Sequence, residues 1–178
     1  MARSSPPDTP ATGSILARFE ATLAGHDSAT LALERWWSRR GLAAPVRIQV
    51  RVIERALALP PPDILRALAL ARGEEAARRR VELRCGPHVL SIATNWYAPA
   101  RLPADMNRAL AQGEEPFGTV VAPLGFRRRR LERHFPPSTA CPAGTVSAHR
   151  ALLVLPDGRP LAHVHECYTQ ANLAPPPG

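Results

Sequence analysis

The stretch RRRVELRCG, residues 78–86, decides the fold because it starts to alternate directly after three arginines. Side chains two residues apart share one face of a β-strand, so this stretch predicts a strand with an apolar face and a charged face. The apolar face would carry Arg79, Val81, Leu83 and Cys85. Its first residue is an arginine, which would place a guanidinium at the edge of the protein core.

Five further segments are expected to be strands, and the first of them alternates most clearly. They are residues 45–54, 89–99, 124–135, 145–155 and 159–173. Gly86 in one connection, and Asp157 and Gly158 in another, predict tight turns and therefore two hairpins. No strand–helix–strand alternation is present. The expected class is α+β, with a single antiparallel sheet of about six strands.

Helical periodicity predicts helices before and between these strands. The segments are residues 15–24, 30–40, 63–72 and 102–112. Gly25 and Gly41 are expected to end the first two helices, which would form a helical hairpin. The chain is expected to fold as one domain over residues 15–173. Residues 1–14 and 174–178 are expected to be disordered tails.

Charge and composition narrow the classes of function. All 23 cationic side chains are arginines, and the net charge is +8. The absence of lysine excludes Schiff-base catalysis and a phosphate-binding P-loop, both of which need a lysine. The charge favours small anionic ligands over cationic ones. The basic run Arg127–Arg130 offers an alternative contact for nucleic acid, but no nucleic-acid motif surrounds it, so no nucleic-acid partner is expected.

The three cysteines bear on the cellular compartment. Cys85, Cys141 and Cys167 are far apart in the sequence and include no CxxC pair. This spacing argues against a disulfide framework and against a zinc knuckle, and it fits a reducing compartment. No apolar signal-peptide core and no window of membrane-spanning length is present. We therefore expect a cytoplasmic protein with no membrane insertion.

The last strand carries an acid on an apolar face. Glu166 has Val164 and Tyr168 as its neighbours on that face. A buried carboxylate has to be paired or has to shift its pKa, because desolvating an isolated charge is costly. Arg79 would be a buried positive charge, and it would need a partner for the same reason. Two interpretations stay open: Arg79 and Glu166 form a structural salt bridge, or they bind a ligand.

The other face of the last strand carries residues that can bind metals. His163, His165 and Cys167 would project together there. A tetrahedral site needs a fourth ligand, and histidines on the wet face of a sheet are more often plain surface residues. A nucleophilic Cys–His pair would need a third, orienting group, which is not evident. No metal and no other cofactor are expected.

Five short motifs, in this order, resemble the chorismate pyruvate-lyase family, whose members convert chorismate to 4-hydroxybenzoate and pyruvate. The motifs are DSATLALERW (27–36), RRVELRC (79–85), NWYAP (95–99), EEPFG (114–118) and PDGRPLAHVHECY (156–168). The resemblance covers roughly residues 25–173. It implies a six-stranded antiparallel sheet with helical flaps over a buried ligand pocket. That chorismate lyase-like fold is related to the effector-binding domains of GntR-type regulators, the UTRA-type fold.

The resemblance also implies roles for residues of this chain. Arg79, or Arg80 if the strand register is shifted by one residue, would bind the substrate carboxylate, and Glu166 would hold the ring hydroxyl. The other implied pocket residues are Ala29, Phe117, Gly118 and Tyr168. Ala29 and Phe117 stand where the family pattern has a methionine and a leucine, which changes the shape of the pocket.

The implied activity is that of a cofactor-independent carbon–oxygen lyase. Arg79 would clamp the ring carboxylate and Glu166 would accept from the 4-hydroxyl while pyruvate is eliminated from chorismate or a close relative. The product would serve ubiquinone biosynthesis. The alternative is a non-catalytic domain of the same fold that binds an aromatic or cyclic acid. In both cases the expected partner is a small anionic cyclic molecule, and the protein is expected to be a monomer or a homodimer.

Overall fold

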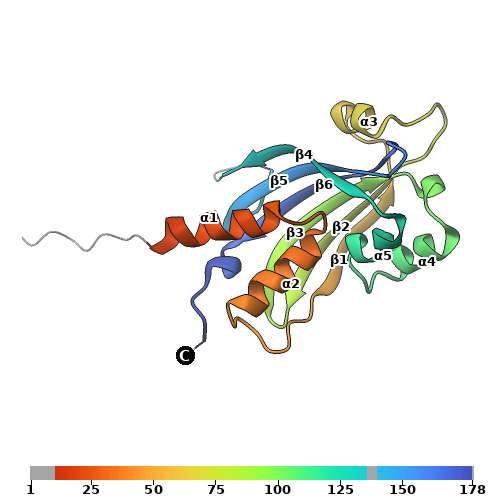
Figure 1. Cartoon of the computed structure of the whole chain (residues 1–178). Coiled ribbons are helices and arrows are strands. Elements are labelled where there is room, and N and C mark those ends of the chain that lie inside the picture. The colour runs from red at the N-terminus through yellow and green to blue at the C-terminus, as the bar shows by residue number, and fades with distance from the viewer. Residues whose placement is uncertain (1–10, 136–139, 178) are drawn as a thin grey trace, which may run out of the picture.

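The chain forms one six-stranded antiparallel sheet in a computed structural model, which describes residues 11–135 and 140–177. The strands follow the spatial order β1-β2-β3-β6-β5-β4 (Figure 1). Their bounds are β1 Gln49–Leu57, β2 Ala77–Cys85, β3 His88–Tyr97, β4 Arg127–His134, β5 Thr145–Val154 and β6 Pro160–Thr169. The predicted α+β class with a single antiparallel sheet of about six strands is confirmed.

Five α-helices accompany the sheet in the described part of the chain. They are α1 Ala11–Ala24, α2 Ala29–Arg39, α3 Pro62–Leu68, α4 Ala104–Gln112 and α5 Phe117–Val121. The first helix begins at Ala11, inside the segment that was expected to be a tail, and residues 1–10 and 178 lie outside the described residues. No helix within the described ranges is long and apolar enough to cross a membrane.

Two tight hairpins build the sheet from segments that are close in sequence. β2 and β3 are joined by two residues, and Gly86 has a φ of +55°, a backbone angle that glycine adopts without strain. β5 and β6 are joined through the predicted turn, in which Gly158 has a φ of +88°. β3 pairs with β6, so these two strands form the centre of the sheet.

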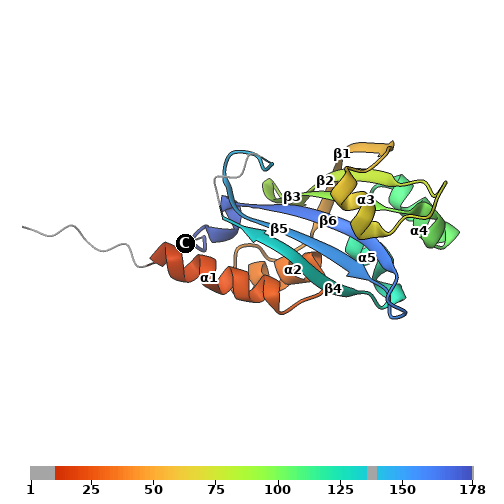
Figure 2. The ribbon, with the colours of Figure 1, turned by 90° about the horizontal axis from the view of Figure 1, so that it is seen from above.

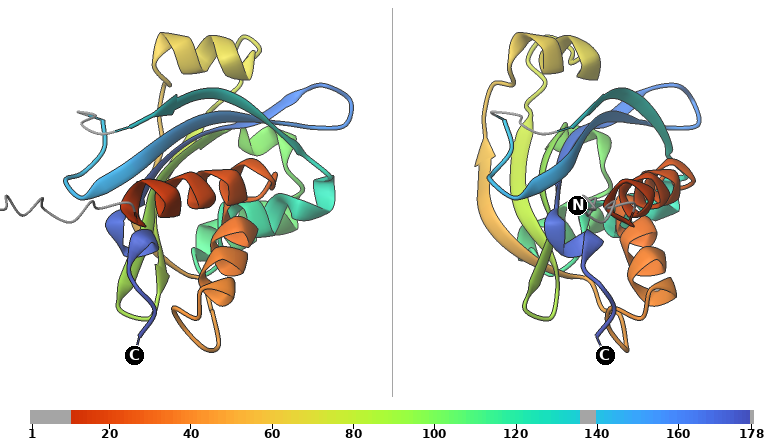
Figure 3. Two further views of the ribbon diagram at one scale, coloured as in Figure 1. Left: turned by 60° about the vertical axis from the view of Figure 1, so that its left-hand side comes forward. Right: turned by 90° about the vertical axis from the view of Figure 1, so that its left-hand side faces the viewer.

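The pairing register confirms the predicted faces of β2. Val81 lies opposite Val52 of β1 and Ala93 of β3. Val81, Leu83 and Cys85 are buried in one core cluster with side chains of α1 and α2. The sheet curves around these helices (Figure 3), and we call this concave side the inner face.

Helices cover both faces of the sheet. On the inner face, α1 and α2 contribute the aromatic side chains Phe19, Trp36 and Trp37 to one core cluster. α4 and α5 pack over the neighbouring part of the inner face in a second cluster. α3 lies on the opposite, outer face (Figure 2). There Leu68 packs with Trp96.

Candidate ligand-binding site

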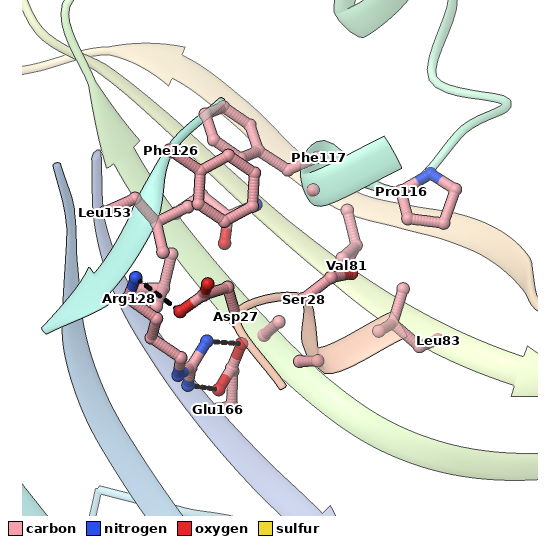
Figure 4. Close-up of a pocket in the computed structure, with 15 residues that line it drawn as sticks. Asp27, Ser28, Val81, Leu83, Pro116, Phe117, Phe126, Arg128, Leu153 and Glu166 are labelled. Carbon is pink, nitrogen blue, oxygen red and sulfur yellow. Dashed lines mark hydrogen bonds and ion pairs between the residues drawn. The ribbon is translucent and has the colours of Figure 1, made fainter. Parts of the chain in front are cut away.

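A small cavity lies on the inner face, where the loop between α1 and α2 meets the start of α5 (Figure 4). The sheet closes it from the other side. Its volume is about 40 Å³, which is room for roughly one or two water molecules. The residues that line it include Asp27, Ser28, Ala29, Asn95, Phe117, Gly118, Arg128 and Glu166.

A buried ion pair forms one side of this cavity. Arg128 of β4 donates from both terminal nitrogens to the two carboxylate oxygens of Glu166 on β6, with an Nη1–Oε1 distance of 3.2 Å. Only 5% of the Arg128 side chain and 7% of the Glu166 side chain are exposed. The hydroxyl of Tyr168 donates to Oε2 of the same carboxylate over 2.8 Å. The carboxylate is therefore fully paired inside the protein.

These contacts fix the protonation state of the three groups. Burial alone would raise the pKa of Glu166, but the charge of Arg128 and the hydrogen bonds from Arg128 and Tyr168 lower it overall. Burial and the charge of Glu166 raise the pKa of Tyr168 well above its ordinary value. Burial opposes the charge of Arg128, but the Glu166 carboxylate still raises the pKa of this arginine. The pair is therefore ionised and neutral as a whole.

The loop between α1 and α2 is held against β4 and α5. Asp27 Oδ1 accepts a hydrogen bond from the backbone N–H of Arg128 over 2.9 Å. Ser28 is the N-cap of α2 and accepts from the backbone N–H of Leu31. Gly118 lies so near that a Cβ atom added to it would be 3.4 Å from Ser28 Oγ. These contacts bring the loop and α5 together at the edge of the cavity.

Arg79 of β2 is a second buried arginine on the inner face. Its side chain is completely buried, and its Nη2 donates to the backbone carbonyl of Glu115, just before α5, over 2.9 Å. Its Nε and Nη1 have no hydrogen-bond partner among the described residues. Burial lowers the pKa of Arg79 most strongly; Tyr97 offsets part of this shift, and the charge of Arg55 adds to it. The guanidinium is therefore held here at an energetic cost.

Arg79 and Glu166 share the inner face but are not in contact. Arg79 lies opposite Asn95 of β3, and Asn95 lies opposite Val164 of β6. Glu166 is therefore two strands away from Arg79, which corresponds to about 10 Å of strand spacing. The interpretation that Arg79 and Glu166 form a direct salt bridge is wrong, because Arg128 occupies the partner position.

The other predicted pocket residues differ in their placement. Those that line the cavity are Ala29, Phe117 and Gly118. Tyr168 does not line the cavity, but its hydroxyl donates a hydrogen bond to Glu166, which does. Arg80 lies opposite Thr94 on the outer face, because side chains alternate along β2. Arg80 therefore points away from the inner face, whereas Arg79 lies on the inner face but is not among the residues that line the cavity.

Sequence reasoning misses Asn95 and Arg128 as site residues. Arg128 stands in a run of four arginines, which gives no local reason to single it out. The available signal is Phe126, two residues earlier, which is buried in a core cluster. Alternation from Phe126 places Arg128 and Arg130 on the inner face, and Arg130 indeed reaches the carbonyl of Leu23 in α1.

The outer face of β6 corrects the expectation of reduced cysteines. Cys167 forms a disulfide with Cys141, and their Cα atoms are 5.7 Å apart. The two residues are 26 positions apart in the sequence, a spacing that matches no short motif. They meet because β5 runs back beside β6 and carries the preceding segment with it. Cys85 is free and buried, and the cytoplasmic location stays a prediction.

The fold is shared with ligand-binding domains of GntR-family regulators. The effector domain of PhnF from Mycobacterium smegmatis is similar over 80% of this chain and 88% of that chain, with a TM-score of 0.58 and 12% identity. The ligand-binding domain of a GntR-family regulator from Bordetella bronchiseptica is similar over 68% of this chain and 82% of that chain, with a TM-score of 0.52 and 20% identity. Likeness at such low identity shows the fold alone.

Sequence comparison places the chain in a family. No family model matches it. The uncharacterized protein y4mC of Sinorhizobium fredii (strain NBRC 101917 / NGR234) is 33% identical to it over 174 residues. The match covers 87% of this chain and 73% of y4mC. The chain therefore belongs to the same family as y4mC.

Proposed function

We propose that this protein binds a small molecule with an acidic group, and that Arg79 takes up that group. The observation that carries the proposal is the completely buried Arg79 guanidinium, two of whose nitrogens have no partner among the described residues. The fold supports it, because ligand-binding domains of regulators have the same architecture. Apolar walls such as Phe117 and Phe126 favour an aromatic or other cyclic acid.

Electrostatics explain why the ligand should be an anion. A charge buried without a counter-charge costs several kcal/mol, and a carboxylate or phosphate beside Arg79 would offset that cost. Arg55 lies opposite Arg79 on β1 and adds a second positive charge. Arginine also matches the planar geometry of carboxylates and phosphates. The local charge therefore selects anions over neutral molecules.

The cavity has to open before a ring-shaped ligand can enter. Ligand pockets usually measure about 300–1,000 Å³, whereas this cavity measures about 40 Å³. We expect the start of α5 to move, because the Glu115 carbonyl now accepts the hydrogen bond that a ligand carboxylate would take over. Phe117, two residues further on, would then pack against the ring.

The pair of Arg128 and Glu166 would give the ligand a second polar contact. The pair is already neutral and complete, so it does not need a ligand for its own stability. A carboxylate oxygen can nevertheless accept a further hydrogen bond, and a ligand hydroxyl is a suitable donor. A cyclic acid with a hydroxyl at the far end of the ring would reach from Arg79 towards Glu166.

The test compares variants of two adjacent arginines that face opposite sides of the sheet. 4-Hydroxybenzoate, benzoate and inorganic phosphate are titrated against the protein, with 4-hydroxybenzamide as the neutral control. At a ligand concentration of about 100 times Kd, binding should stabilise the wild type and Arg80→Met by about 2.7 kcal/mol in thermal unfolding. Arg79→Met should lose this effect. The proposal is wrong if Arg79→Met binds these acids as tightly as the wild type, or if none of them stabilises the wild type.

Chorismate lyase activity is a second and narrower candidate. It is favoured by the position of Arg79 and Glu166 on one face of the sheet, because the family resemblance assigns the substrate contacts to these two residues. Glu166 would act as a hydrogen-bond acceptor, since Arg128 keeps it ionised. The assay incubates the protein with chorismate and follows 4-hydroxybenzoate by absorbance. Binding of chorismate without product would leave the ligand-binding domain as the function.

A further inference from the structure

We propose that Cys141, His165 and Cys167 bind a zinc ion when the disulfide between the two cysteines is reduced. The three ligand atoms lie within 4.8 Å of one another. Nε2 of His165 is 3.8 Å from Cys141 Sγ and 4.0 Å from Cys167 Sγ. His165 and Cys167 lie on the outer face of the sheet, so this site is separate from the cavity and does not depend on the ligand proposed for Arg79.

The distances suit tetrahedral zinc. Zn–S bonds of about 2.3 Å and Zn–N bonds of about 2.0 Å place neighbouring ligand atoms about 3.5–3.8 Å apart. The imidazole nitrogen is already close to this distance from both sulfurs. Reduction breaks the bond between the sulfurs, which then separate to non-bonded contact. That separation opens the space in which the ion would lie.

The sheet supplies a rigid support for two of the three ligands. His165 and Cys167 are alternate residues of β6, which pairs with β3 on one side and β5 on the other. Cys167 is buried, whereas Cys141 is half-buried, so solvent and ions can reach the site from the Cys141 side. The backbone N–H of Gln170 donates to the carbonyl of Gly144 and holds the Cys141 segment beside the end of β6.

The donor set selects a borderline-soft ion. Thiolate and imidazole ligands suit zinc, whereas calcium and magnesium need oxygen ligands. Arg150 lies opposite His165 on β5, and its positive charge favours the thiolate form of nearby cysteines. Two thiolates neutralise a divalent ion, so the arginine does not oppose it. The described residues bring three ligands together here, so we assign the fourth position to water.

Reduction and metal binding are coupled through protons. A dithiol reductant passes two electrons to the disulfide and becomes a disulfide itself, and its two protons end on the sulfurs of Cys141 and Cys167. Zinc then displaces these two protons, because cysteine binds metal as thiolate. The oxidised chain has no thiolate at this position and should not bind.

Cobalt(II) is the probe for this site, because it takes tetrahedral thiolate sites and absorbs visible light. The whole protein is reduced with a phosphine, which becomes the phosphine oxide while water supplies the oxygen and the two protons. It is then desalted without oxygen and titrated with cobalt(II). We expect a single bound ion with a thiolate-to-cobalt charge-transfer band that zinc abolishes, and no binding by the oxidised protein. A reduced protein without this band, or equal binding after oxidation, would overturn the proposal.

Variants identify the ligands. Cys141→Ser and His165→Ala should each weaken binding by more than about 100-fold, because losing even a partner of a ligand costs about 10–100-fold. His163→Gln is the matched control, since His163 lies on the same strand and face but outside the cluster. It should bind as the wild type does, and circular dichroism verifies that all variants fold. Wild-type affinity in His165→Ala, or an equal loss in His163→Gln, would show that the assignment is wrong.

Discussion

Two arginines are buried on the inner face of the sheet, and they differ in what surrounds them. Arg128 is paired with Glu166, to which Tyr168 also donates. Arg79 donates to one backbone carbonyl and keeps two nitrogens without a partner among the described residues. A buried charge that is fully paired contributes to a defined fold, whereas one that is left unpaired costs stability and indicates a binding role. The contrast separates a structural arginine from one that is available to a ligand.

Replacing Arg128 should give the largest change in the free energy of unfolding. Arg128→Met leaves Glu166 buried without its partner and should lower the free energy of unfolding by about 3–5 kcal/mol. Urea unfolding followed by circular dichroism measures this change. Arg129→Met changes the exposed neighbour on β4 and should stay within about 0.5 kcal/mol of the wild type. A loss of less than about 1 kcal/mol in Arg128→Met would make this pair no stronger than a surface ion pair.

Replacing Arg79 should change the free energy of unfolding less, and in the opposite direction. Arg79→Met removes an uncompensated buried charge and gives up one hydrogen bond, to the Glu115 carbonyl. Because the desolvation cost exceeds what that bond contributes, the ligand-free variant should be more stable by about 1 kcal/mol in urea unfolding. Arg80→Met, on the outer face, is the control and should change little. Clear destabilisation by Arg79→Met would contradict the contrast with Arg128.

The smallest expected effect is a change in how the stability depends on pH, and it comes from the buried pair of Glu20 and His149. Glu20 of α1 is buried, and Nε2 of His149 lies 2.9 Å from its Oε2. Burial would raise the pKa of Glu20, but the hydrogen bond and charge of His149 and the charge of Arg133 lower it overall. A carboxyl whose pKa is lower in the folded state stabilises the fold above its unfolded value, and this stabilisation is lost as the pH falls through the folded pKa.

Thermal unfolding between about pH 5 and about pH 3 measures this contribution, because an unperturbed glutamate titrates in that range. The wild type should lose stability more steeply than Glu20→Gln as the pH falls. Arg79 has no ion pair among the described residues, so its replacement should leave the slope unchanged. Equal slopes in the wild type and Glu20→Gln would contradict the assigned pairing of Glu20.

The sheet and its faces are predictable from the sequence because each depends on local patterns. Alternation from Arg79 to Cys85 places the first arginine on the apolar side, and the register of β2 with β3 agrees. The same reasoning places Glu166 inside, between Val164 and Tyr168. Gly86 marks its hairpin because a positive φ is needed there.

The partners of these residues are not predictable, because they depend on register and on long-range contacts. Alternation from Phe126 turns Arg128 inward, but it does not show that Glu166, two strands away on β6, is the partner of this arginine. The approach of Cys141 to Cys167 depends on where the segment before β5 passes. Local sequence patterns contain neither kind of information.

The run of arginines on β4 has a consequence for association, because β4 is one edge of the sheet. An unpaired edge offers backbone hydrogen bonds to a second chain, and charged side chains are a common protection against such pairing. Arg127 and Arg129 are exposed on this strand, while Arg128 is turned inward. Two such edges brought together would set guanidinium against guanidinium, so the strand that completes the interior ion pair is also expected to resist pairing with a second copy of itself.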